Sequence, residues 1–349
     1  MTIFYILLLA IIKGLILITM LLLVAATNVY VERRIAAFIQ QRIGPNRVGP
    51  FGLLQPFADV LKLFLKEDIV PDGADKAVHG LAPVISLFAT FTVWSVIPFA
   101  DSFQLFGYTI QVGIAPDVNI GLLFILAMTS VGIYGITLAG WSSNNKYSLL
   151  GGLRASAQMI SYELSMGLAI IGVIIISGSF NLTDIVHAQA NAWGGFRWNV
   201  FLQPVGFMIF LISAFAETNR APFDFPEAEQ ELVAGYNTEY SGMRFGMFFL
   251  AEYVNITLSA TFIVLLYFGG WALPFRPEFT GLITGSPWLA LVQLLWFILK
   301  IWVLVFFIMW VRWTLPRFRY DQLMHIGWKI LMPIAILNII ITAIVVHLL

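Results

Sequence analysis

The sequence predicts an all-α polytopic membrane protein with about eight transmembrane helices and an amphipathic helix at the membrane surface. Apolar residues make up 60% of the chain and charged residues only 11%, whereas an ordinary soluble domain has about 25% charged residues. Stretches of roughly 20 mostly apolar residues, enough to cross about 30 Å of hydrocarbon, recur along the chain. Because these apolar runs are continuous rather than alternating, we expect helices and not the strands of a barrel.

The expected spans form one integral membrane domain over residues 1–349. The first span begins without a basic segment, contains Lys13 and is about twice as long as the apolar core of a signal peptide, so we interpret it as a retained helix. The eight spans are placed near residues 3–30, 79–100, 118–140, 156–177, 200–216, 244–272, 288–312 and 328–348.

Lysine and arginine predict which side of the membrane each connection faces. Of the 19 basic residues, only Arg197 and Arg276 lie in connections after even-numbered spans, and only Lys13 and Lys300 lie well inside spans. All the others lie in the connections after the first, third, fifth and seventh spans or at the span ends beside them, so these connections are expected on the cytoplasmic side. With an even number of spans, both termini then lie on the non-cytoplasmic side. We interpret Lys13 and Lys300 either as counter-ions or as side chains that extend to the interface or to a partner.

Composition excludes several classes of function. The formal net charge is zero, so the chain offers no broad basic field for nucleic acid. It contains no cysteine, which excludes disulfides, thiolate-held iron–sulfur clusters and zinc–thiolate sites. With only four histidines spread over both expected sides, we expect neither a haem nor a metal site in this chain. Any electron-transfer chemistry must then act on a mobile carrier, with metal centres supplied by a partner.

The first cytoplasmic connection, residues 31–77, is expected to have a fixed shape. Glu32 and Arg33 close the first expected span, and Gly-Pro steps at 44–45 and 49–50 predict tight turns. These turns would hold the arginines of the connection, among them Arg42 and Arg47, in defined places.

Residues 51–66 of this connection predict an amphipathic helix on the membrane surface. Gln55, Asp59, Lys62 and Lys66 recur at helical spacing, opposite an apolar stripe. We interpret the helix as a lip over an opening through which an amphipathic ligand such as a quinone enters from lipid. The alternative is a helix that only anchors the bundle or seats a partner.

Three carboxylates lie within or at the ends of expected spans. An ionised acid at mid-membrane costs roughly 2.5–3.5 kcal/mol, so such residues usually serve a function. Glu163 and Glu252 lie at similar depth in the fourth and sixth spans, and Glu217 ends the fifth. If the spans are neighbours, these acids form a relay that passes protons. The alternative is structural pairing of Glu163 with Arg154 or of Glu252 with Arg244.

The connection 217–243 is strongly acidic. Between Glu217 and Glu239 it holds six acids and a single basic residue, Arg220. Pro222 and Pro226 oppose a continuous helix and keep the acids presented to solvent or to a partner. We interpret the segment as a proton-collecting or charge-switching antenna that feeds Glu217, as a docking patch for a basic subunit, or as both.

Several long motifs, in order, carry a resemblance that covers nearly the whole chain. The chain resembles the membrane-arm subunit of respiratory complex I that helps build the quinone chamber, known as the H subunit in bacteria and as subunit 1 in mitochondria. The motifs are Glu32-Arg-Arg34, Gly44-Pro-Asn-Arg-Val-Gly-Pro50, Trp141-Ser-Ser-Asn-Asn-Lys-Tyr-Ser-Leu-Leu-Gly151, Arg154-Ala-Ser-Ala-Gln158, Ala216-Glu-Thr-Asn-Arg-Ala-Pro-Phe-Asp224, Pro226-Glu-Ala-Glu-Gln-Glu-Leu232 and Glu239-Tyr-Ser-Gly-Met243.

The resemblance implies a subunit of a proton-pumping NADH:quinone oxidoreductase. Quinone would be the substrate, and this chain would bind no nicotinamide, flavin or iron–sulfur cluster itself. Its partners would be the peripheral-arm iron–sulfur and quinone-site subunits and the small membrane-arm and antiporter-like subunits, in a bacterial plasma membrane or, as the alternative, the mitochondrial inner membrane. Spans two to six would resemble half of an antiporter-like proton channel.

Two sets of residues carry these expectations. We expect the quinone site to include Glu32, Arg33, Arg42, Arg47, Asp59, Lys62, Arg220 and Asp224. We expect the proton or charge relay to include Glu163, Glu217, Glu252, Glu227, Glu229 and Glu231.

Two other functions use the same features. One is the equivalent membrane subunit of a membrane-bound hydrogenase or a related dehydrogenase, which the intact turn 44–50 and the acidic connection disfavour. The other is a secondary ion transporter, which the absence of a convincing internal repeat disfavours.

Overall fold

The membrane-spanning helical fold predicted from the sequence is confirmed. The computed structural model describes residues 2–105, 107–190, 197–224, 233–274 and 285–348. Within them, seven helical stretches are long and apolar enough to cross a membrane, and a shorter apolar helix, α8 (Pro204–Glu217), corresponds to the expected fifth span. The seven are α1 (Thr2–Ile39), α3 (Lys76–Val93), α4 (Gly121–Ser142), α5 (Lys146–Ser177), α10 (Gly242–Tyr267), α12 (Pro287–Thr314) and the run of α13 (Tyr320–His325), η5 (Ile326–Leu331) and α14 (Met332–Leu348).

Three helices extend well beyond the apolar stretches that predicted them. Helix α1 ends at Ile39, so Glu32 and Arg33 lie inside the helix and do not close it. Helix α5 begins at Lys146, ten residues before the expected start at 156, and the last helical run begins at Tyr320 rather than 328. Hydropathy detects the stretch that can lie in hydrocarbon, whereas a helix continues into polar sequence wherever neighbouring helices pack against it.

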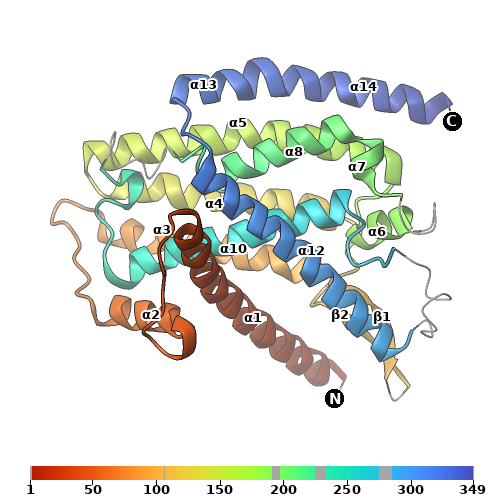
Figure 1. Cartoon of the computed structure of the whole chain (residues 1–349), viewed down its shortest axis with the longest axis horizontal. Coiled ribbons are helices and arrows are strands. Elements are labelled where there is room, and N and C mark those ends of the chain that lie inside the picture. Colours follow the sequence, from red (N-terminus) through yellow and green to blue (C-terminus); the bar gives the residue numbers. More distant parts are fainter. Residues whose placement is uncertain (1, 106, 191–196, 225–232, 275–284, 349) are drawn as a thin grey trace.

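The core is a bundle in which α3, α4, α5 and α10 run side by side, with α8 and α14 packed on α5 (Figure 1). Small residues allow the closest approaches. A Cβ atom on Gly135 of α4 would lie 2.8 Å from the backbone nitrogen of Ser86 on α3, so only glycine fits there. Helices α1 and α12 cross this bundle obliquely and pack against α10 (Figure 1).

One end of the bundle carries elements that the sequence did not predict. They are the antiparallel hairpin β1 (Ala100–Leu105) and β2 (Tyr108–Val112) and the short helices α6 (Leu182–Ala190) and α7 (Asn199–Leu202). Figure 1 shows both chain ends on this side. This arrangement agrees with termini on a common side of the membrane, while the side that faces the cytoplasm stays a prediction.

The two lysines within spans bind backbone carbonyl groups at this same end. The ammonium group of Lys13 donates to the carbonyl of Gly113 at 2.9 Å. That of Lys300 donates to the carbonyls of Phe268 and Gly270 at 2.8 and 2.7 Å, where α10 ends. Both lysines therefore donate to carbonyl groups of neighbouring elements, a role that the sequence did not suggest.

The amphipathic helix lies at the opposite end of the bundle, as α2 (Gln55–Leu65), and is shorter than the expected 51–66 (Figure 1). The helix does not reach back to residue 51 because Phe51 and Gly52 have φ angles of 53° and 79°, outside the helical region, and residues Pro50–Gly52 form a short turn, η1, instead. Much of the apolar face of α2, including Leu61 and Leu65, is exposed in the isolated chain. Such an uncovered face suits contact with lipid or a partner.

Candidate functional site

The segment at the end of α8, residues 216–224, is held deep in the bundle. The side-chain amide of Gln158 on α5 donates to the carbonyls of Ala216 and Phe223, each at 2.8 Å. On the other side, the backbone N–H of Phe318 donates to the carbonyl of Pro222, and the rings of Phe223 and Phe318 stack with centroids 5.5 Å apart. The segment is thus fixed between α5 and the residues that follow α12.

Arg220 in this segment joins two carboxylates from two different helices. Its Nη1 atom lies 2.5 Å from Glu32 of α1 and its Nε atom lies 2.5 Å from Glu252 of α10. The guanidinium group also lies over the ring of Tyr253, 4.3 Å from its centroid. Because Arg220 is only 2% exposed, its charge is stable there only with such partners.

Arg312 on α12 completes this ion network, since it donates to the second carboxylate oxygen of Glu32. The network therefore connects α1, α10, α12 and the segment after α8. The four charged residues, Glu32, Arg220, Glu252 and Arg312, are called the ion network below.

A second ion pair adjoins the ion network. Arg317 donates to Asp224 at 2.9 Å. Burial raises the pKa of Asp224, and the guanidinium groups of Arg317 and Arg312 oppose this rise. The other carboxylate oxygen of Asp224 is buried without a hydrogen-bond donor among the described residues. Asp224 thus responds both to the local cations and to any donor that enters beside it.

The remaining residues expected at the quinone site lie on the surface near α2. Arg33, which follows Glu32 on α1, binds Asp59 of α2 at 2.7 Å and ties the two helices together. Arg42, Arg47 and Lys62 are exposed. The eight expected residues therefore divide into a buried group around Arg220 and a surface group at α2. Glu32 belongs to the buried group, and the next residue of α1, Arg33, belongs to the surface group.

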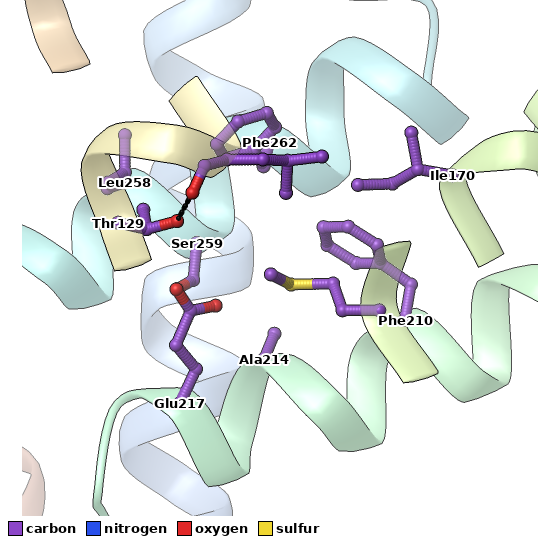
Figure 2. Close-up of a pocket in the computed structure, with 10 residues that line it drawn as sticks. Thr129, Ile170, Phe210, Ala214, Glu217, Leu258, Ser259 and Phe262 are labelled. Atoms are coloured by element: carbon purple, nitrogen blue, oxygen red, sulfur yellow. Dashed lines mark hydrogen bonds between the residues drawn. The ribbon is translucent and has the colours of Figure 1, made fainter. Parts of the chain in front are cut away.

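Glu217, the last residue of α8, faces internal cavities. Figure 2 shows its carboxyl group pointing into a mostly apolar cavity, toward Ser259 and Thr129. Glu217 also lines two more polar cavities, each with a volume of about 30 Å³. A cavity needs roughly 10–15 Å³ of volume and at least two polar partners to hold a water molecule. Both polar cavities therefore have room for water beside the carboxyl group.

The structure brings the three expected relay acids together. Glu252 and Glu217 line the same polar cavity, into which Asn255 also projects. Glu163 on α5 accepts a hydrogen bond from Ser130 of α4, and its charge acts on Glu217. Glu217 of α8 and Glu252 of α10 thus share a cavity, and Glu252 belongs also to the ion network. A relay of protons through these two acids and Glu163 stays a prediction.

The structural pairings considered from the sequence are wrong. Arg244 binds Asp68 at 3.0 Å rather than Glu252. The guanidinium group of Arg154 lies 4.8 Å from the ring centroid of Tyr320, and Glu163 is bonded to Ser130 instead.

Three of the expected relay acids, Glu227, Glu229 and Glu231, lie outside the described residues. Within the described ranges, no three His, Asp or Glu side chains are gathered so as to hold a metal ion.

Sequence reasoning missed several members of the site. The sequence argument used Arg312 and Arg317 only to predict the orientation of the spans. An arginine at the end of an apolar span can also pair with an acid of a neighbouring helix, and this possibility could have been considered. Ser130 follows Thr129 in the apolar helix α4, and Gln158 lies among small and polar residues of α5. Nothing local in the sequence marks their partners, which lie 33 and 58 or more residues away.

Comparisons with known proteins cover almost the whole chain. Residues 12–343 match the family model described as NADH dehydrogenase. The H subunit of the NADH-quinone oxidoreductase of Salinibacter ruber is 54% identical over 326 residues, which cover 93% of this chain and 92% of that protein. NADH-quinone oxidoreductase subunit 8 of Rhodothermus marinus is 55% identical and covers 93% of both chains. The NADH-quinone oxidoreductase H 2 subunit of Koribacter versatilis is 51% identical and covers 98% of both.

Proposed function

The chain belongs to the NADH dehydrogenase family, as the bacterial H-type membrane subunit of the NADH-quinone oxidoreductase complex, and on this premise we propose that it lines the quinone path and couples quinone reduction to proton movement. The observation that carries the proposal is Arg220, which contacts Glu32 and Glu252 at once. Glu252 in turn lines a cavity with Glu217.

The quinone enters from lipid beside α2, where Arg33 and Asp59 meet and where Arg42 and Arg47 are exposed nearby in the sequence. Cationic groups there guide the polar head group past the edge of α1. The head group then comes close to Glu32, which lies on the other side of the same helix turn. Electrons reach it from an iron–sulfur cluster in a peripheral-arm partner.

Reduction changes the charge beside Glu32, and the ion network transmits this change. When a new negative charge or a stronger interaction with Glu32 draws Arg220 away from Glu252, Glu252 loses its counter-charge. A proton on Glu252 is then favoured, and the polar cavity shared with Glu217 supplies it through water. Glu163, whose charge acts on Glu217, extends the chain of acids toward α4. No side chain of this subunit forms a covalent bond in the process.

The placement of the subunit follows from the same proposal. Its partners are the peripheral iron–sulfur and quinone-site subunits near α2 and the acidic connection, and small and antiporter-like membrane subunits beside the bundle. The connection with Glu227, Glu229 and Glu231 either docks a basic subunit or feeds protons to Glu217. The membrane is the bacterial plasma membrane, the inner one where two are present.

The relay is tested with Glu217→Gln and Glu163→Gln in the assembled enzyme, reconstituted in vesicles. We expect both variants to lose most quinone-coupled proton pumping while NADH:ferricyanide reduction, which bypasses the membrane subunit, stays normal. Asp72→Asn, an exposed acid of the first connection, is the matched control. Normal pumping in both assembled variants would refute the relay.

The quinone path is tested separately with Arg47→Ala. This variant should raise KM for quinone and leave ferricyanide reduction unchanged, because Arg47 is an exposed cation at the proposed entrance. An equal loss of both activities would indicate failed assembly rather than a weakened entrance.

The two other functions receive no support from the relatives of the chain. The relatives named above are called NADH-quinone oxidoreductase subunits, which favours the quinone enzyme over a hydrogenase subunit or a secondary transporter.

A further inference from the structure

His79, in the first turn of α3, is a fully buried histidine to which the proposed relay assigns no role. Its side chain has 0% exposure, and among the described residues neither ring nitrogen has a hydrogen-bond partner. The imidazole stacks on the ring of Tyr240, with centroids 4.0 Å apart and ring planes inclined by 12°. A buried imidazole without partners is costly unless water or an exchanging proton satisfies it.

The backbone carbonyl of His79 also lacks its regular helical donor. The N–H of His79 donates to the carbonyl of Asp75 at 2.8 Å in the regular helical pattern. Its own carbonyl should accept from the N–H four residues later, but that residue is Pro83, which has none. Among the described residues, the two ring nitrogens have no partner and the carbonyl lacks its i+4 donor, so the polar atoms of His79 are suited to binding water.

The buried face of α3 leads from His79 to the Glu217 cavities. Ser86 and Thr90 follow His79 at spacings of seven and eleven residues, which place all three on one side of the helix, and all three are buried. Ser86 lines both polar cavities that Glu217 lines, and Thr90 lines one of them.

An aromatic layer separates His79 from the nearer polar cavity. Tyr236 and Phe248 line that cavity, and their rings lie 5.3 Å apart. Phe248 also contacts Tyr240 at 5.1 Å, and Tyr240 covers His79. The three rings therefore form a continuous packed layer between His79 and this cavity.

The charged groups around His79 are engaged with one another. Arg244 of α10 binds Asp68, which follows α2, at 3.0 Å. Glu239, before α10, accepts a hydrogen bond from the side chain of Asn145 at 2.6 Å. The charges of Arg244, Asp68 and Glu239 all act on His79, yet none of these groups bonds its ring nitrogens, which are left free for water and protons.

We propose that His79 is a second proton-entry site for the Glu217 cavities, separate from the route through the ion network. His79 takes a proton from water at the α2 end of the bundle and releases it to water in the cavity that Ser86 and Glu217 line. Glu217 then accepts it, so charge and protons balance. The inference rests on the proposed relay role of Glu217.

The test compares His79→Phe with wild type in the assembled enzyme in vesicles. Phenylalanine keeps the stacked ring on Tyr240 and removes only the nitrogens. We expect NADH:ferricyanide reduction to be unchanged and coupled proton pumping to fall by about half or more, because the entry site at His79 loses its proton-transfer group while the other route stays open. His325→Phe, which changes an exposed histidine of α13, is the matched control and should pump normally.

A second variant separates proton transfer from packing. His79→Ala should lose pumping and regain part of it when imidazole is added, whereas a packing role predicts no such rescue. Normal pumping in His79→Phe would overturn the proposal, as would a loss in His79→Ala that imidazole does not relieve. If His79→Phe pumps normally while Glu217→Gln does not, the entry site is refuted and the relay stands. If both pump normally, the proposed function itself fails.

Discussion

Replacing Arg220 by Met removes a buried cation that contacts two carboxylates. Glu32 keeps Arg312 as a partner in this variant, so the carboxylate left without its cation is Glu252, whose side chain is 15% exposed. Removing one partner of a buried ion pair costs about 3–5 kcal/mol. If this loss appears in the rate of unfolding, thermal inactivation of the assembled enzyme becomes roughly 10²–10⁴-fold faster.

The double variant Arg220→Met with Glu252→Gln gives the decisive comparison. It removes the stranded charge, so it should inactivate within about tenfold of the wild-type rate. The assay is the rate of loss of NADH:quinone activity at fixed elevated temperature, with assembly checked by native electrophoresis. A double variant as labile as Arg220→Met, or a single variant as stable as wild type, would refute the assignment of Arg220 as the counter-charge of Glu252.

Three further substitutions probe the contacts around this network. Arg33→Ala breaks a surface pair with Asp59 in which Arg33 is 42% exposed, so it should change stability by less than about 1 kcal/mol and yet raise KM for quinone in steady-state assays. Gln158→Met removes the side-chain donor from the carbonyls of Ala216 and Phe223. Ala216 keeps a backbone bond from Asn219, so the cost is about 1–3 kcal/mol for the Phe223 carbonyl, and the variant should lower quinone-dependent kcat but not the ferricyanide rate. Arg317→Gln removes a cation that lowers the pKa of Asp224, so the carboxyl group protonates at higher pH and the acid limb of the quinone-reductase pH profile should move upward, whereas an unmoved limb would exclude Asp224 from that titration.

Burial energetics explains which parts of the site were predictable. Glu163, Glu217 and Glu252 were singled out because an acid in an apolar span is costly, and the structure places Glu217 and Glu252 on one cavity. Their true partners were out of reach. Glu32 and Arg220 are 188 residues apart in the chain, and no local pattern indicates that a cation from one connection bridges two distant helices.

The fold shows the same division between local and long-range information. Apolar length predicted the spans, but the extension of α1 to Ile39 depends on neighbours that hydropathy does not detect. The hairpin β1–β2 was missed because five or six residues of strand leave only a weak signal between strongly apolar spans. Lys13 donates to the carbonyls of Gln111 in β2 and of Gly113 just beyond it, and these contacts explain why a lysine is present in the first span.

Redox-induced infrared difference spectroscopy of the assembled enzyme tests most directly whether charge at the quinone alters protonation of Glu217. Quinone reduction should change a protonated-carboxyl C=O band that is absent in Glu217→Gln and altered in frequency or amplitude in Arg220→Lys, because lysine cannot bridge two carboxylates as a guanidinium group does. A band that persists unchanged in Glu217→Gln would contradict the coupling of the ion network to the Glu217 cavities.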